Sequence, residues 1–169
     1  MTGRPVFFSF HYRRDIWRAS NIRKSNQFSA QAAAGWTDAS LWEKAKLTGS
    51  GEVRRLIESG LADTSVTVVL IGAETSKRRW VDYEIRRSYE RGNGVIGVRI
   101  HRLADQFRKR DIRGDTPAAL IENQAFVRDY NSARLGSWIE LAAIGAGKKC
   151  LQHGERNCLQ CRLAFRIFS

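Results

Sequence analysis

Short apolar runs alternate along the chain with stretches in which apolar residues recur every three or four positions. The clearest run is residues 65–71, SVTVVLI, which is rich in β-branched residues and lacks polar alternation, as a strand buried on both faces requires. Similar runs predict strands at residues 6–10 and 95–100, and residues 120–127 have the pattern of a short final strand.

Helical spacing predicts helices between these strands. Residues 28–36 are ambiguous, because three consecutive alanines favour a helix, whereas a short strand ending near Trp36 fits the alternation. Strands that are joined by helices indicate βαβ units, so the sequence predicts an α/β fold whose parallel sheet is covered on both faces. The helices are expected at about residues 15–24, 51–59, 79–91 and 135–143.

The chain has 169 residues, the length of one ordinary domain. Its charge is less ordinary, with 29 basic against 17 acidic residues, a net charge of +12, and 22 arginines among the basic residues. Because guanidinium groups bind phosphate and carboxylate at two points, this excess indicates an anionic partner such as nucleic acid, a dinucleotide or an acidic protein. A solvated surface of arginine-rich composition explains the scattered arginines equally well.

Two features of the sequence bear on localisation. The longest apolar run is too short to span a bilayer. The N-terminus lacks the apolar segment of a secretory signal. We therefore expect a cytoplasmic protein with no membrane partner.

The carboxyl ends of parallel strands, where such folds bind ligands, fall at residues 9–12, 72–75 and 99–101. His11 at the first strand end can bind phosphate or carry a proton, or it can cap the following helix together with Asp15. Ser9, His11 and Asp15 do not form a convincing nucleophilic triad, since no Gly-x-Ser-x-Gly turn is present. The absence of a P-loop and of G-x-G-x-x-G argues against a Walker ATPase and a Rossmann dehydrogenase.

Glu84 is a candidate acid on the helix predicted after residues 65–71. It lies at the margin of the apolar face and shares a flank with Trp80, one turn earlier. A carboxylate that leans into a cleft beside an aromatic ring has a raised pKa, and it can act as a base or stabilise a developing cation. The alternative is a surface carboxylate paired with Arg78, Arg87 or Arg91.

Residues 145–169 form a basic tail that holds all three cysteines, and we expect it to be an appendage to a domain of residues 1–144. An odd number of cysteines without a signal sequence argues against a disulfide framework. The tail has the spacing C-x2-H-x4-C-x2-C, which predicts a structural zinc site; the alternative is a tail whose thiols have no role. The four candidate zinc ligands are Cys150, His153, Cys158 and Cys161.

A set of ordered motifs covers residues 4–144. Together they resemble the bacterial TIR-like domain family that includes the sensor proteins of Thoeris anti-phage systems. The motifs are VFFSFHY at 6–12, GWTDASLW at 35–42, LADTSVTVVLIG at 61–72, RRWVDYEI at 78–85, GVIGVRIH at 94–101 and LGSWIE at 135–140.

This resemblance implies a flavodoxin-like, three-layer TIR fold with a central parallel sheet of about five strands. Enzymatic TIR domains cleave the nicotinamide–ribose bond of NAD, so NAD is the expected substrate. Thoeris sensors respond to a phage component by making a cyclic ADP-ribose isomer, which activates a separate effector. Self-association is also expected of such domains.

The resemblance also implies roles for single residues. Glu84, in a W-x-x-x-E context with Trp80, matches the glutamate that TIR enzymes use. Arg78 is a candidate for holding the pyrophosphate. The residues expected to line the nucleotide cleft are Phe8, Ser9, Phe10 and His11.

Two further functions remain open from the sequence, because fold membership alone does not establish catalysis. The chain can be a non-catalytic TIR-like adaptor, or a regulator associated with nucleic acid, as the charge and the cysteine-rich tail suggest. The enzyme hypothesis predicts that Glu84→Gln abolishes function with little change in the unfolding midpoint, whereas an adaptor is indifferent to this substitution.

Overall fold

The computed structural model describes residues 4–25, 45 and 47–148. Strands and helices alternate through this part of the chain. In chain order they are β1 (Val6–Phe10), α1 (Tyr12–Lys24), α3 (Ser50–Leu61), β2 (Val66–Ile71), the 3₁₀ turn η2 (Thr75–Lys77), α4 (Arg79–Glu90), β3 (Gly94–Arg99), α5 (Ala118–Glu122), β4 (Phe126–Asp129) and α6 (Ser132–Gly145).

The four described strands form one parallel sheet in the order β1-β2-β3-β4. Val6 of β1 lies opposite Val66 of β2, which in turn lies opposite Gly94 of β3, and Ile96 lies opposite Phe126 of β4. Every residue of β2 is buried, as its unbroken apolar run predicts, because it has a strand on each side and helices on both faces. The predicted parallel α/β fold is confirmed.

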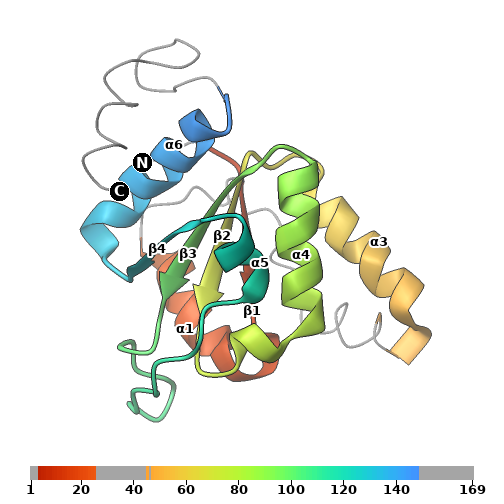
Figure 1. Cartoon of the computed structure of the whole chain (residues 1–169). Coiled ribbons are helices and arrows are strands. Elements are labelled where there is room, and N and C mark those ends of the chain that lie inside the picture. Colours follow the sequence, from red (N-terminus) through yellow and green to blue (C-terminus); the bar gives the residue numbers. More distant parts are fainter. Residues whose placement is uncertain (1–3, 26–44, 46, 149–169) are drawn as a thin grey trace.

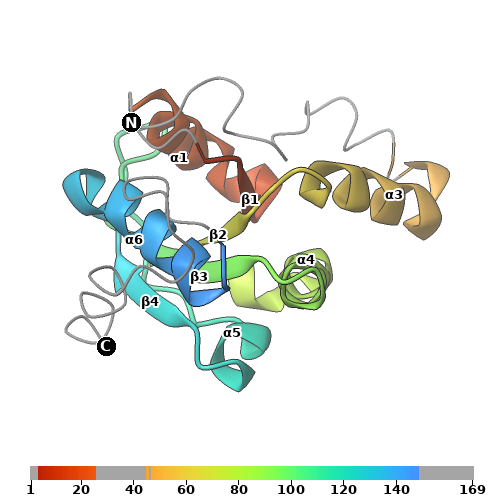
Figure 2. The same ribbon diagram turned by 90° about the horizontal axis from the view of Figure 1, so that it is seen from above.

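Side chains alternate between the two faces of the sheet and build a separate core on each. On one face, Val68 and Leu70 of β2 pack with α1 and α6. On the other face, Val69 and Ile71 pack with α4 and α5, and Phe7 of β1 packs with α3. Figure 1 shows these three layers, and in Figure 2 α1 and α6 lie on one side of the sheet while α3, α4 and α5 lie on the other.

The final strand comes later than the sequence predicts. The run 120–127 is divided, because its first residues belong to the short helix α5 and β4 begins only at Phe126. Leu120 is buried within the helical turn. Polar residues 122–124 then interrupt the apolar run, and the chain turns there with Gln124 in the left-handed region at φ 51°.

Several predictions lie outside the described residues. They are the ambiguous segment 28–36 and the four candidate zinc ligands of the tail, so both stay predictions, as does the domain boundary at residue 144. Within the described residues, no group of three His, Cys, Asp or Glu side chains is arranged to hold a metal ion. The same part of the chain contains no helix that is long and apolar enough to cross a membrane.

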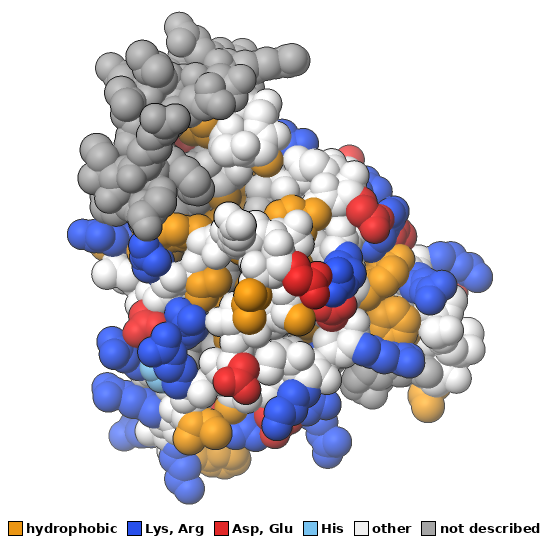
Figure 3. All heavy atoms as spheres, viewed as in Figure 1, with side chains coloured by type: hydrophobic (Ala, Val, Ile, Leu, Met, Phe, Trp, Pro, Cys, Tyr) orange, Lys and Arg blue, Asp and Glu red, His pale blue; other side chains and the backbone are white. Residues whose placement is uncertain are grey.

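Arginine and lysine side chains are prominent on the surface in Figure 3. Some form ion pairs with acids of the same or a neighbouring element. Arg86 of α4, for example, pairs with Asp82 of the same helix and with Glu122 of α5. Figure 3 also shows a gathering of basic side chains next to the lower end of β3, where the loop of residues 100–116 leaves the sheet. The positive charge is therefore partly neutralised on helices and locally concentrated at one strand end.

Candidate functional site

Glu84 lies in the middle of α4, on the buried face of the helix with Val81, Ile85 and Ser88. Its spacing places it only at the margin of the apolar face, yet the residue is 7% exposed. The hydroxyl of Ser9, on β1, donates a hydrogen bond of 2.5 Å to Oε2 of Glu84. Helix α4 therefore holds a carboxyl group below the surface, against the first strand.

The alternation of side chains along β1 decides which residues face Glu84. Phe7 packs with α3, and Ser9, on the same face of β1, reaches α4. Val6 and Phe8 instead point into the core beneath α1 and α6. Phe8 is 2% exposed, so the structure places it in the core rather than in the nucleotide cleft that the resemblance implies.

Burial changes the acid–base chemistry of Glu84. Removal from water disfavours the charged form and raises the pKa of Glu84 to about 8, although the hydrogen bond from Ser9 favours the carboxylate and opposes this shift. No cation of the described residues contributes to the shift. Near neutral pH the carboxyl group is therefore mainly protonated, and a cation brought against it favours its ionised form.

The alternative that Glu84 is a surface carboxylate paired with an arginine is wrong. Each of the three arginines concerned pairs with an acid other than Glu84. Arg78 pairs with Glu74, and both Arg87 and Arg91 pair with Glu58.

A cavity of about 430 Å³ opens beside Glu84 at the carboxyl end of β1. Its wall comes from the end of β1, the first turn of α1, η2 and the first half of α4. This volume is within the range of small-molecule sites, about 300–1,000 Å³. The lining residues are Phe10, His11, Tyr12, Arg13, Lys77, Arg78, Arg79, Trp80, Val81 and Glu84.

The cavity combines three kinds of chemical group. Four of its ten lining residues are Arg or Lys, and Glu84 is the single acid among them. The guanidinium of Arg79 lies 4.7 Å from the centre of the Trp80 ring, and the rings of Phe10 and Tyr12 stack at 5.9 Å. The cavity therefore offers aromatic faces for a ring, cations for phosphate groups and one buried carboxyl.

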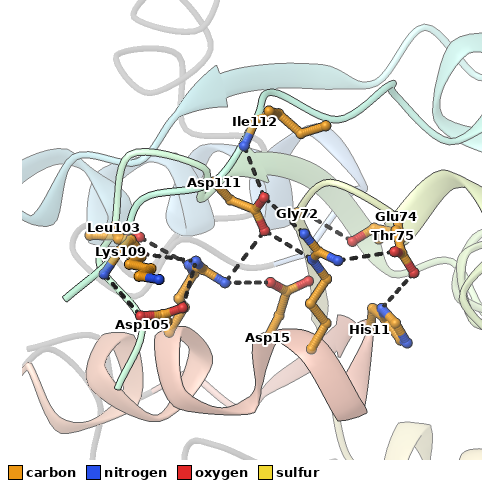
Figure 4. A network of polar contacts seen from close by, with 12 residues as sticks. His11, Asp15, Gly72, Glu74, Thr75, Leu103, Asp105, Lys109, Asp111 and Ile112 are labelled. Atoms are coloured by element: carbon orange, nitrogen blue, oxygen red, sulfur yellow. Dashed lines mark hydrogen bonds and ion pairs between the residues drawn. The ribbon is translucent and has the colours of Figure 1, made fainter. Parts of the chain in front are cut away.

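Glu74, in the turn after β2, gathers basic side chains at one edge of this cavity. Arg14 donates from Nη1 to Oε1 of Glu74 at 3.0 Å, Arg78 donates to Oε2, and Nδ1 of His11 lies 3.9 Å from the same Oε2 (Figure 4 shows His11 and Glu74). The hydrogen bond from Arg78 holds the pKa of Glu74 below its usual range. Arg78 therefore lines the cavity with part of its guanidinium already bound.

Arg14 extends this network to the loop after β3, because its Nε donates to Asp111 at 2.9 Å. Arg18 lies 3.7 Å from Asp111 and donates to the fully buried Asp15 at 3.2 Å; Figure 4 labels both of these acids. Burial raises the pKa of Asp15 to about 6, against the opposing charge of Arg18. A Cβ at Gly72 would lie 2.2 Å from Oδ2 of Asp15, so α1 approaches the end of β2 this closely because residue 72 is glycine.

The structure brings most of the predicted site residues together. The alternative role of His11 as a side-chain cap is not seen, because it occupies the N-cap position of α1 without a capping hydrogen bond from its side chain. The predicted residues that line the cavity or contact Glu84 are Ser9, Phe10, His11, Arg78 and Trp80.

Sequence reasoning did not identify five of the lining residues as site residues: the apolar Val81, and Tyr12, Arg13, Lys77 and Arg79. Tyr12 belongs to the strand end at residues 9–12, and a consistent use of that rule finds it. No signal distinguishes the three basic residues among the 29 of the chain.

Comparison with known proteins supports this reading of fold and motifs. Residues 7–105 match the family described as "Thoeris protein ThsB, TIR-like domain". A protein of Bacillus cereus (strain MSX-D12), named "Putative cyclic ADP-D-ribose synthase ThsB1", is 46% identical over 138 residues, which cover 80% of this chain and 71% of that protein. The resemblance drawn from the sequence motifs is confirmed, and the chain belongs to the family of ThsB TIR-like domains.

Proposed function

We propose that this chain cleaves the bond between nicotinamide and ribose in NAD and closes the remaining ADP-ribose into a cyclic product. The observation that carries the proposal is the buried carboxyl of Glu84, which has Ser9 as its hydrogen-bond donor and lies in the wall of a cavity with aromatic and basic groups. The name of the Bacillus cereus relative, a cyclic ADP-D-ribose synthase, supports this class of product.

Glu84 suits the charge changes of this reaction. As the bond from ribose C1′ to the pyridinium nitrogen breaks, its electron pair leaves with nicotinamide and C1′ gains oxocarbenium character. An ionised carboxylate facing the sugar stabilises that charge. The pyridinium ring of NAD is itself a cation, so its binding favours the ionised form of a carboxyl whose pKa is raised to about 8. Ring closure joins C1′ to a nucleophilic atom of the same ADP-ribose and releases one proton.

The remaining groups of the cavity suit the rest of the substrate. Trp80 lies one helical turn before Glu84 and lines the cavity, where the pyridinium ring of NAD would take the place of the Arg79 guanidinium on its ring. The basic lining residues, Arg78 among them, suit the diphosphate. A cation stacked on an aromatic ring contributes about 0.5–2 kcal/mol, so we expect Trp80→Ala to raise KM for NAD by about two- to thirtyfold.

The cellular role follows from the family. We propose that a phage component triggers the chain, that the cyclic product is a messenger to a separate effector, and that the chain self-associates. Without this trigger the purified protein can be inactive, so the test includes cells challenged with phage.

The test measures nucleotides by mass spectrometry, with the purified protein and NAD and in cells before and after phage challenge. Glu84→Gln is compared with Glu52→Gln, which makes the same substitution on the surface of α3. We expect nicotinamide and a cyclic ADP-ribose species from the native chain and from Glu52→Gln, and neither from Glu84→Gln. Equal products from all three proteins, or none from any of them across several phages, would reject the proposal.

A further inference from the structure

The carboxyl end of β3 carries arginines that the Glu84 cavity does not use. Arg99 ends β3, and Arg128 lies on the adjacent strand β4. Arg113 comes from the loop after β3 and is near enough to repel Arg99. Asp129 is the acid beside Arg99, and its Oδ2 is already 3.5 Å from Nη1 of Arg102. The charges that act on Arg99 are therefore the two arginines Arg113 and Arg128 against the single carboxylate of Asp129.

Among the described residues, the hydrogen-bond contact of Arg99 is with a neutral group rather than an acid. Its Nη2 donates to the neutral hydroxyl of Thr116 at 3.1 Å, and its Nε is buried without a hydrogen-bond partner among the described residues. Burial and repulsion from Arg113 and Arg128 lower the pKa of Arg99, and Asp129 only opposes this shift. A buried cationic donor that lacks an acceptor is costly, so the side chain is suited to an anion that supplies one.

The loop that carries Arg113 lies against Arg99 and the sheet, since Thr116 of this loop is the residue that accepts from Arg99 at 3.1 Å. A Cβ at Gly114 would lie 2.0 Å from the carbonyl oxygen of Gly72, so the loop backbone rests directly on the end of β2. Within the described part of the chain, Arg113 forms no hydrogen bond or ion pair. Its guanidinium is therefore available beside Arg99.

We propose that the carboxyl end of β3 is a phosphate-binding site in which Arg99 and Arg113 contact the ligand. Two neighbouring guanidinium groups match the several oxygens of a phosphate or diphosphate, because each guanidinium binds phosphate at two points. The location is also the one that parallel α/β sheets use for ligands. Sequence analysis marks residues 99–101 as such a strand end, and the Glu84 cavity does not include them.

The phosphate can come from two sources. Neighbouring strands are about 4.8 Å apart, so the end of β3 is about 10 Å from the end of β1, within the reach of an extended dinucleotide. The diphosphate of NAD is one source, and this alternative rests on the proposed function. A separate phosphate-bearing ligand is the other source, and that alternative does not rest on the proposed function.

Inorganic pyrophosphate is the probe for the site, and the Nε–H signals of arginine side chains in a ¹⁵N-labelled full chain are the readout. The signal of Arg99 is identified by its loss in Arg99→Lys, which keeps the charge but removes the guanidinium. We expect pyrophosphate to shift this signal saturably, and Arg113→Gln to weaken that response at least tenfold. Arg55→Gln, which removes a charge from an exposed position on α3, should change the midpoint less than twofold. An Arg99 signal that stays fixed, or equal midpoints in Arg113→Gln and Arg55→Gln, would overturn the proposal.

A second titration separates the two sources, with NAD added to Glu84→Gln to prevent turnover. It follows the indole N–H signal of Trp80, identified by its loss in Trp80→Phe, beside the signal of Arg99. If the Arg99 and Trp80 signals move together, the site holds the diphosphate of NAD. If the Trp80 signal moves alone, the site takes a separate phosphate ligand. If NAD moves neither signal while pyrophosphate still moves that of Arg99, the proposed function fails and the phosphate site stands.

Discussion

Replacing Glu84 by glutamine tests the buried acid through protein stability, independently of any activity. The unfolded chain releases the proton of Glu84 near the ordinary pKa of 4.5, whereas the folded chain retains it to about pH 8. Between these values the unfolded state binds fewer protons, so rising pH destabilises the native chain. The stability of the native state falls in this way because the fold keeps an ionisable group away from water.

The size of the effect follows from the two pKa values. Between pH 5 and pH 7.5, titration of Glu84 alone removes on the order of 3 kcal/mol from the free energy of unfolding. Glutamine does not titrate and is nearly the same size as glutamate. The free energy of unfolding of Glu84→Gln therefore lacks this pH-dependent decrease. Because 1 kcal/mol shifts the midpoint of a chain of this length by about 2–4 °C, the variant should gain roughly 6–12 °C over the native protein on going from pH 5 to pH 7.5.

The assay is thermal unfolding of both proteins by circular dichroism across this pH range. Asp15 also has a raised pKa, but it titrates in both proteins and its contribution cancels in the difference. Glu52→Gln is the matched control and should follow the native protein at every pH. A midpoint difference between Glu84→Gln and the native chain that does not change with pH would refute the argument that Glu84 is a buried, protonated acid.

The same reasoning predicts that kcat/KM for NAD rises with pH toward a plateau above about pH 8, since the proposed reaction needs the ionised Glu84. Ser9→Ala removes the hydrogen bond that favours the carboxylate, so the midpoint of this profile should move to higher pH; an unchanged midpoint contradicts the pairing. Gly72→Ala forces a methyl group against buried Asp15 and should cost about 1–3 kcal/mol in urea unfolding. Gly51→Ala, whose added Cβ meets no atom within 4 Å, should be neutral or stabilising.

Much of the fold could be predicted because burial leaves a direct trace in the sequence. The run of β-branched residues at 65–71 became the fully buried β2, and the helical spacing after it became α4. The prediction of a strand over 120–127 was wrong for the first residues of this run, since apolar content does not distinguish a buried helical turn from a strand. There the polar residues 122–124 decide the outcome.

The site was predictable in its position and less so in its detail. The rule of strand ends found residues 9–12 and 72–75, which lie at the cavity or beside it. Sequence analysis placed Phe8 with Ser9 in one cleft, although neighbouring residues of a strand face opposite ways. It also expected an unchanged unfolding midpoint for Glu84→Gln, because helical spacing gives the direction of a side chain but not how completely it is covered. The burial of Glu84 replaces that expectation with a pH-dependent one.

The hydrogen bond between Ser9 and Glu84 joins positions 75 residues apart in the chain. The two groups meet only after the first strand has paired in the sheet and α4 has packed over it. A chain still on the ribosome that ends before α4, or a fragment cut between these elements, contains neither the cavity nor the buried acid. For an enzyme whose proposed substrate is shared by the whole of metabolism, this makes completion of the fold a safeguard, because an immature or damaged copy has no means of consuming NAD.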